Sequence, residues 1–266
     1  MPTRDHYDNG IPSWVDLMTP DITASRTFYG GLFGWDFTEN PTGDPDSPYL
    51  IAMLDDRPVA GMMGLSADAA AQGTPPCWST YLAVDDIEAT FATVAAAGGQ
   101  PMMPPMQVMD TGHMALLADP TGAVVGLWQA GTHVGAGLVN EHGAVTWNEL
   151  QTPDPAAAAS FYGTLVGWGS QTMDMGPAGD YTVFTLGDEM IAGAMNPPQP
   201  EVPAHWSVVF ATDDADATAA GAKELGGTVH EAPFDMPIGR LTVIADPHGV
   251  VFQAIKMNPS DQAADP

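Results

Sequence analysis

The chain of 266 residues has little cysteine, little positive charge and no long hydrophobic run. Cys77 is the only cysteine, which excludes an intramolecular disulfide. Only 6 Lys and Arg residues face 33 Asp and Glu, and the formal net charge of −27 repels nucleic acid and anionic membranes. No stretch approaches the ~20 apolar residues of a membrane helix. These absences predict a cytoplasmic protein with neither nucleic acid nor membrane as a partner.

Motifs of several enzyme classes are also missing. The sequence contains no phosphate-binding loop, no GxGxxG after a strand, no GxSxG and no HExxH. These absences argue against nucleotide-dependent chemistry, a serine hydrolase of the α/β type and a zinc protease.

What the sequence does have is an internal repeat. Four features recur at a constant offset of 133 residues: Trp14 as Trp147, Thr19-Pro20-Asp21 as Thr152-Pro153-Asp154, Phe28-Tyr29-Gly30 as Phe161-Tyr162-Gly163, and Gly34-Trp35 as Gly167-Trp168. Two later features recur at offsets of 128 and 127: Gly98-Gly99 as Gly226-Gly227, and Asp119-Pro120 as Asp246-Pro247. A repeat of this kind indicates a duplicated module that lost a few loop residues in its second copy.

Each copy divides again into two similar units, each a strand, a helix and three further strands. We therefore predict an α+β fold of four βαβββ units, whose curved mixed sheets enclose cups. The first module spans residues 11–130 and the second 143–256, joined by a linker at 131–142. The polar, Pro-containing tail at 257–266 is predicted to be disordered.

Alternation along the first strand of each module predicts which side chains face the cup. Trp14, Asp16 and Met18 fall on one face, and Trp147, Glu149 and Gln151 are their counterparts. An acid two residues after the Trp in both copies is the most informative polar feature. Asp16 and Glu149 either contact a ligand and exchange protons with it, or form structural pairs at the mouth of the cup.

A basic or titratable residue occupies the same position in both modules. Gly112-His113 matches Gly239-Arg240 at an offset of 127. Each acid could therefore have a partner, His113 for Asp16 and Arg240 for Glu149. If the partners converge, they could hold a polar ligand group or move a proton; otherwise they are structural.

Aromatic and methionine residues offer an apolar lining. Tyr81 and Trp128 lie on later strands of the first module and are candidates to contact a ligand, although such residues also build ordinary cores. Four methionines between residues 102 and 109 are predicted to form a Pro-rich loop, a pliable rim over the cup.

The helix running through Phe-Tyr-Gly-x-Leu-x-Gly-Trp, the Gly-Gly helix end and the Asp-Pro-x-Gly turn before a last strand resemble the vicinal oxygen chelate superfamily. That superfamily includes glyoxalase, bleomycin-resistance and extradiol dioxygenase proteins. The run from Ala118 to Gln129 is similar to an actinobacterial subgroup of tandem modules, which includes proteins named hydroxylases and a mycobacterial antigen. The resemblance covers almost the whole chain.

The resemblance also implies where a metal would bind. Metal-dependent members are expected to carry His, Gln or Glu at positions that map, in this sequence, to Trp14, Ser79 and Gly126, and to Trp147, Ser207 and Gln253. One Gln and two Ser do not supply the converging donors that a divalent ion needs. We therefore predict no metal and no cofactor, with Ser79, Ser207 and Gln253 lining a ligand site.

Three functions remain open. The first is a metal-independent protein that binds a small, partly apolar molecule for resistance, sequestration or secondary metabolism. The second is a metal-independent hydroxylase, cyclase or lyase with Asp16 or Glu149 as acid–base. The third is a glyoxalase-type lyase acting on 2-oxoaldehydes. A monomer and a homodimer are both compatible with the sequence.

Overall fold

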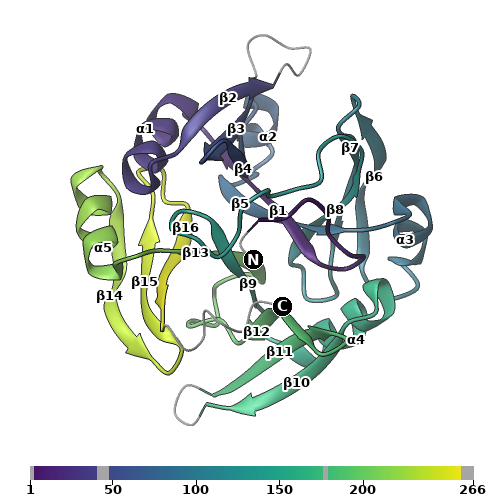
Figure 1. The fold of residues 1–266 in the computed structure, drawn as a ribbon. Coiled ribbons are helices and arrows are strands. Elements are labelled where there is room, and N and C mark those ends of the chain that lie inside the picture. The colour runs from purple at the N-terminus through teal and green to yellow at the C-terminus, as the bar shows by residue number, and fades with distance from the viewer. Residues whose placement is uncertain (1–2, 41–47, 176–178, 259–266) are drawn as a thin grey trace.

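The computed structural model describes residues 3–40, 48–175 and 179–258, and most of the tail predicted to be disordered lies outside them. The fold is α+β, with two eight-stranded mixed sheets that confirm the predicted class (Figure 1). In the part of the chain that the structure describes, no helix is long and apolar enough to span a membrane.

Module 1 contains two βαβββ units and a short connecting helix. The first unit comprises β1 (Pro12–Thr19), α1 (Ile22–Phe33), β2 (Asp36–Asn40), β3 (Tyr49–Leu54) and β4 (Arg57–Gly64). After α2 (Ala67–Ala71), the second unit comprises β5 (Cys77–Ala83), α3 (Ile87–Thr93), β6 (Gln100–Val108), β7 (Gly112–Ala118) and β8 (Val124–Ala130).

Module 2 repeats this order. Its first unit comprises β9 (Val145–Gln151), α4 (Pro155–Val166), β10 (Gly169–Asp174), β11 (Asp180–Leu186) and β12 (Glu189–Met195). Its second comprises β13 (His205–Ala211), α5 (Ala215–Glu224), β14 (Thr228–Met236), β15 (Gly239–Ala245) and β16 (Val251–Met257).

Local sequence sets the boundaries of the helices. Asp21 caps α1, its side chain accepting a hydrogen bond of 2.9 Å from the Ala24 amide. Gly34 ends the helix in the left-handed region at φ +72°, where glycine is favoured. Asp154 and Gly167 do the same for α4, which also begins with Pro155.

The two units of each module join along their first strands. The sheet order is β2-β3-β4-β1-β5-β8-β7-β6 in module 1 and β10-β11-β12-β9-β13-β16-β15-β14 in module 2. β1 runs parallel to β4 and antiparallel to β5, so the first strands lie at the centre of the sheet. The central strands β1 and β9 therefore carry their side chains onto the floor of each cup.

The helices α1, α3, α4 and α5 pack against the sheet of their own module, and α1 and α4 also reach into the core of the other module. One apolar core combines Phe28 and Phe33 of α1 with Phe210 and Phe252 of module 2, and all four rings are buried. A second core joins module 1 residues such as Leu82 to Phe161 of α4 in the same way. In Figure 1 the helices accordingly lie in pairs, α1 beside α5 and α3 beside α4. Residues of both modules therefore contribute to each of these two cores.

Polar contacts fix this arrangement at equivalent places. The Tyr29 hydroxyl donates to Asp246 at 3.3 Å, and Tyr162 donates to Asp119 at 3.3 Å, each across the boundary between the modules. The aspartates also accept amide hydrogen bonds within their own Asp-Pro-x-Gly turns, such as that from the Thr121 amide at 2.8 Å. The turn motif that marks the repeat is therefore part of the junction between modules.

One sequence expectation about local structure is wrong. The Pro-rich segment with four methionines is the edge strand β6 through Val108, rather than a loop. Prolines are tolerated there because an edge strand has one side without ladder partners, and the register shifts twice along its pairing with β7. Met102 and Met106 are exposed on this edge.

Candidate ligand-binding site

The concave face of each sheet, away from the helices, carries the candidate residues of the first strands. Trp14 packs there with Tyr81 and Trp128, in a cluster separate from the two cores around the helices. Asp16 lies on the same face, and its carboxyl group is hydrogen-bonded to the side chains of Tyr49, Tyr81 and Ser79. Met18, at the end of the same row, is half-buried beside its strand partner on β5.

In module 2 the same face carries Trp147, Glu149 and Gln151, together with Ser207 and Gln253. The opposite face of β9 holds Asn148, a polar residue that suits an apolar core poorly. Its side-chain oxygen accepts a hydrogen bond of 2.9 Å from the Thr80 hydroxyl of module 1. Because Asn148 has this buried partner, it can lie on the helix side of β9, and the residues of β9 alternate between the two faces as those of β1 do.

Each cup contains a hydrogen-bonded chain of Trp, Tyr and acid. In module 1 the Trp14 indole donates to the Tyr49 hydroxyl at 2.8 Å, and that hydroxyl approaches Asp16 at 3.5 Å. In module 2 the Trp147 indole donates to Tyr181 at 2.9 Å, and Tyr181 bonds Glu149. The duplication has therefore kept a polar relay on both floors.

A glycine opposite each tyrosine makes room for this relay. Gly61 faces the Tyr49 hydroxyl and Gly193 faces that of Tyr181, so closely that a Cβ at either glycine would collide with the phenol. Tyr49 and Tyr181 were not among the residues expected from sequence. The sequence does contain a signal for these two residues, because in both modules a tyrosine precedes a glycine by twelve residues.

The cup of module 1 is closed by its own side chains. Trp14, Tyr81 and Trp128 are each at most 8% exposed, and the Tyr81 ring covers Gly126. His133 of the inter-module linker packs edge-on against Trp14 at 4.5 Å between ring centroids. Burial lowers the pKa of His133 to about 4, so this ring is neutral at physiological pH. The linker therefore completes a packed interior in this cup.

Among the described residues, the floor of the module 2 cup is less completely covered. Val209 replaces the bulky Tyr81, Gln253 replaces Gly126, and Trp147, Glu149 and Gln253 are only half-buried. Apolar side chains line the rest of this face: Val209, Leu241, Ile255, Met236, Val243 and Met257. The two modules share a backbone plan and differ in how far their cups are filled.

Hydrogen bonds converge on Glu149 at the centre of the open cup. The Gln151 amide donates to it at 2.6 Å and the Gln253 amide at 3.2 Å, and Tyr181 donates from a third direction. Gln253 also lies 3.2 Å from the Ser207 hydroxyl. Burial raises the pKa of Glu149, and these donors together with His205 oppose that rise. The site is a desolvated carboxylate held by neutral donors.

In the closed cup, the pKa of the acid Asp16 is strongly raised. Asp16 is 5% exposed, and burial raises its pKa to about 6 although Tyr81, Ser79 and Tyr49 donate to it. Its carboxyl group therefore takes up a proton at mildly acidic pH. Neither acid has a Lys or Arg partner among the described contacts.

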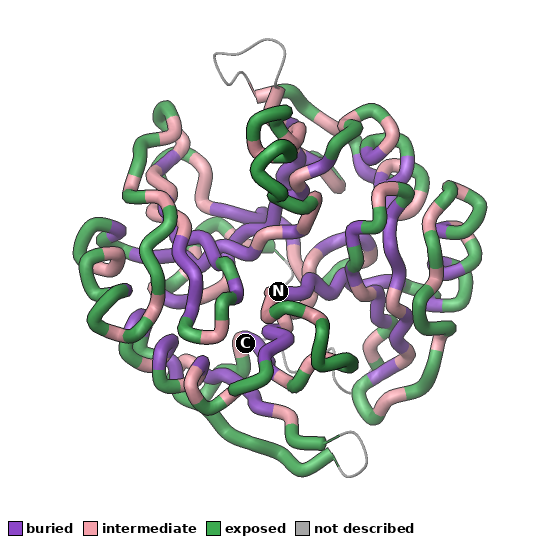
Figure 2. Tube along the Cα trace, turned by 180° about the vertical axis from the view of Figure 1, so that it is seen from behind, coloured by how far each residue is buried: buried purple, intermediate pink, exposed green. Residues whose placement is uncertain are grey.

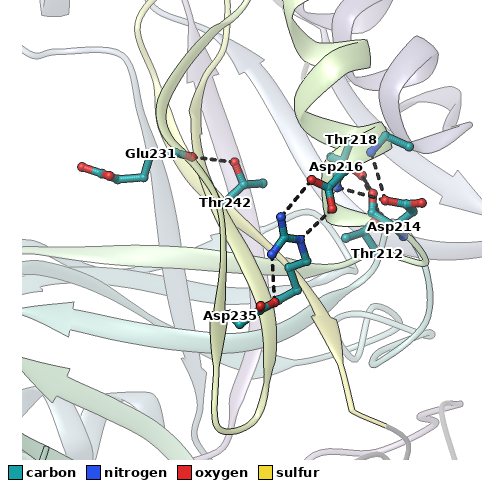
Figure 3. A network of polar contacts seen from close by, with 9 residues as sticks. Thr212, Asp214, Asp216, Thr218, Glu231, Asp235 and Thr242 are labelled. Carbon is teal, nitrogen blue, oxygen red and sulfur yellow. Dashed lines mark hydrogen bonds and ion pairs between the residues drawn. The ribbon is translucent and has the colours of Figure 1, made fainter.

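The structure does not form the expected pair of Glu149 with Arg240. The guanidinium binds Asp216 of α5 at 2.6 Å and Asp235 of β14 at 2.8 Å, on the helix side of the sheet. Figure 3 shows the labelled Asp216 and Asp235 on either side of that guanidinium. Arg240 alternates with Leu241, which faces the cup, so its side chain leaves by the other face.

His113 is displaced from Asp16 for the same reason. On β7, Ala115 and Leu117 lie on the same face as His113 and belong to the core beneath the helices. Met114 and Leu116 lie on the other face, toward the cup. The sequence equivalence of His113 and Arg240 was sound, but both lie on the helix side. The titratable residue near Glu149 is instead His205, at the start of β13 and opposite Gln151.

The residues present do not fit the metal site that the fold family implies. In module 1 the three positions hold Trp14, Ser79 and Gly126, and the Tyr81 ring covers the glycine. In module 2, Gln253 turns its amide N–H toward Glu149 and Ser207, leaving one carboxylate among neutral groups. Over the described residues, no three His, Cys, Asp or Glu side chains lie together as a metal would need.

Two hollows lie away from the floor of the module 2 cup. One of about 540 Å³ runs along the surface between α1 and β2–β3, lined by exposed residues such as Thr23 and Arg26. A second, of about 20 Å³, lies behind Trp14 near Tyr7. Figure 2 shows buried residues concentrated along the strands and exposed ones along the outer helices and loops.

The family model for the Glyoxalase/Bleomycin resistance protein/Dioxygenase superfamily matches residues 11–127 and 143–254. The chain therefore belongs to this superfamily, as the sequence motifs indicated. It is 46% identical over 260 residues to "Putative glyoxylase CFP32" of Mycobacterium tuberculosis, covering 97% of this chain and 99% of that protein. It is 36% identical over 267 residues to the anthracycline biosynthesis protein DnrV of Streptomyces peucetius, covering 96% of each.

Solved structures show the same fold at low sequence identity. The 2,3-dioxygenase LapB from Pseudomonas sp. KL28 superposes with a TM-score of 0.66 at 16% identity, covering 95% of this chain and 96% of that one. The Mn(II)-bound glyoxalase from Novosphingobium aromaticivorans gives 0.65 at 15% identity, covering 94% and 83%. These likenesses establish the architecture and leave the chemistry to be argued from the site.

Proposed function

We propose that the cup of module 2 binds a small, partly apolar organic molecule without a metal ion. The observation that carries this proposal is Glu149, a half-buried carboxylate held by Gln151, Gln253 and Tyr181 on an accessible floor. Met236, Val243 and Met257, which are partly buried, supply apolar surface on the same face. An apolar wall with a few fixed polar groups is the usual composition of a small-molecule site.

The donor chemistry supports independence from a metal. A divalent ion needs several converging oxygen or nitrogen ligand atoms, whereas Gln151 and Gln253 both turn an amide N–H toward Oε1 of Glu149. The similarity to anthracycline biosynthesis proteins is compatible with a role in secondary metabolism, resistance or sequestration.

A metal-independent enzyme is the second candidate, as a hydroxylase, cyclase or lyase. It is favoured by the raised pKa of Glu149, because a partly desolvated carboxylate is a stronger base than an exposed one, and by His205 close to it. Asp16 has the same character but lies in the closed cup. A glyoxalase-type lyase acting on 2-oxoaldehydes agrees with the relative named a glyoxylase, but the donors for its expected metal do not fit.

A ligand screen in the presence of a chelator tests the proposal. Aromatic polyketides, other small aromatics and a methylglyoxal–thiol adduct would be added to the purified protein while its melting temperature is followed. We expect at least one compound to raise that temperature, since a ligand bound only to the folded state stabilises it. Arg240→Gln, on the opposite face of the sheet, should retain the effect as the matched control.

Mass spectrometry of the recovered compound separates the two candidates. Unchanged compound supports a binder, whereas a product that forms with time supports the enzyme. If no compound stabilises the protein, or if stabilisation is equal in a Trp147→Ala variant, the cup of module 2 is not the site. Absence of nucleic-acid and membrane partners, a monomeric or dimeric state and a cytoplasmic location remain predictions from the sequence.

A further inference from the structure

One polar atom in the open cup has no partner. Gln151 is 7% exposed, and its amide nitrogen donates to Glu149 at 2.6 Å. Its side-chain oxygen is buried without a hydrogen bond among the described residues. A buried acceptor left without a donor costs free energy, so an unpaired carbonyl beside a carboxylate needs a physical reason.

The floor around Gln151 presents acceptors and lacks a fixed cation. The Glu149 carboxylate, the Gln151 carbonyl and the Ser207 hydroxyl share this face. The basic side chains lie elsewhere: Arg4 before module 1, Arg26 and Arg57 in module 1, Lys223 on α5, Arg240 bound to Asp216, and Lys256 on the strand face opposite Gln253. His205 is the one titratable nitrogen that influences Glu149 among the described groups.

Resting on the proposed function, we propose that this cup selects an organic ammonium ion, a protonated amine attached to an apolar or aromatic body. An ammonium group carries three N–H donors and a positive charge, which together satisfy the Gln151 carbonyl and balance the Glu149 carboxylate. The rings of Trp147 and Tyr181 can add attraction to a cation, and the net charge of −27 draws cations toward the protein. A carboxylate ligand would meet Glu149 with like charge.

The test compares three probes of one shape: benzylammonium, benzyl alcohol and benzoate. Binding is followed at pH 8 through the indole N–H resonances of Trp147 and Trp14, assigned with Trp→Phe variants. We expect benzylammonium to shift Trp147 and leave Trp14 unchanged. Its affinity should exceed that of benzyl alcohol by roughly tenfold or more, and benzoate should not bind.

Two variants separate recognition from structure. Glu149→Gln should reduce benzylammonium binding to the level of benzyl alcohol, while Asp16→Asn in the other cup should leave it unchanged. Gln151→Met installs the residue that module 1 has at this position, Met18. It should weaken benzylammonium binding and raise the melting temperature of the free protein, because the unpaired carbonyl is removed.

The outcomes distinguish this inference from the proposed function. If benzyl alcohol or benzoate shifts Trp147 as strongly as benzylammonium does, the cup binds small molecules but the ammonium assignment is wrong. If Gln151→Met lowers the melting temperature and leaves affinity unchanged, Gln151 is structural and the assignment is also wrong. If no probe shifts Trp147, both the assignment and the proposed function fail.

Discussion

Phe252→Ala is expected to destabilise the whole chain by about 3–5 kcal/mol, the usual cost of deleting a fully buried aromatic ring. Phe252 lies on β16 of module 2 and is 0% exposed. Its ring contacts Phe28, Tyr29 and Phe33 of α1 in module 1, as well as Phe210 of its own module. The cavity therefore opens in a core to which both modules contribute.

Thermal unfolding followed by tryptophan fluorescence checks this expectation. The melting temperature should fall by about 10 °C, in one transition reported equally by the Trp residues of both modules. Val251→Ala, on the same strand but 41% exposed, is the matched control and should change little. A variant in which module 2 melts first, while Trp35 and Trp78 keep their native emission, would refute a shared core.

Asp16→Asn is expected to stabilise the protein at neutral pH by about 1–3 kcal/mol, which is an unusual direction for a substitution at a buried site. Burial raises the pKa of Asp16 from its ordinary value of 3.8 to about 6. The folded state thus holds the proton more tightly than the unfolded state does. The free energy of unfolding contributed by this group is greatest below pH 4 and falls as the pH rises to about 6.

Urea denaturation between pH 4 and 8 measures this linkage. Stability of the wild type should decline across pH 4–6 through this group, and Asp16→Asn should flatten that part of the profile. Asp36→Asn, at an exposed site on β2, provides the control and should keep the wild-type slope. If Asp16→Asn lowers stability at pH 7.5 with the slope unchanged, the carboxylate is ionised and structurally required.

The architecture was predictable because short-range sequence signals determine it and occur in both modules. Helix caps such as Asp21 and Gly34, the alternation along Trp14–Met18 and the Asp-Pro-x-Gly turn each act within a few residues. Their repetition at constant offsets removes most of the ambiguity of any single instance. The faces of β1 and β9 follow directly from the same alternation.

Contacts between modules were not predictable in this way. Nothing near Asn148 in the sequence indicates Thr80 as its partner, and the link from Tyr29 to Asp246 joins residues that are distant along the chain. The predicted pairing of Arg240 with Glu149 was wrong for a related reason. Its position was assigned by equivalence to His113, but alternation along β15 places its side chain beneath α5, where two aspartates bind it.

The two cups that arose by duplication differ in the side chains that occupy them. Tyr81, Trp128 and His133 close the first around Asp16, while in the second Val209 and Ile255 replace Tyr81 and Trp128 and Glu149 is half-buried. A closed and rigid module can support its neighbour through the shared cores. The second module keeps a buried polar atom without a partner among the described residues, the Gln151 carbonyl oxygen, which costs stability.

The most direct test of a metal-free binding cup is to determine metal content and ligand affinity on the same sample. The protein would be purified without chelator, analysed by elemental mass spectrometry, and titrated with a stabilising ligand before and after dialysis against EDTA. The account predicts far less than one equivalent of zinc, iron, nickel or manganese per chain, and the same affinity in both titrations. One tightly held divalent ion per chain, whose removal abolishes ligand binding, would contradict it.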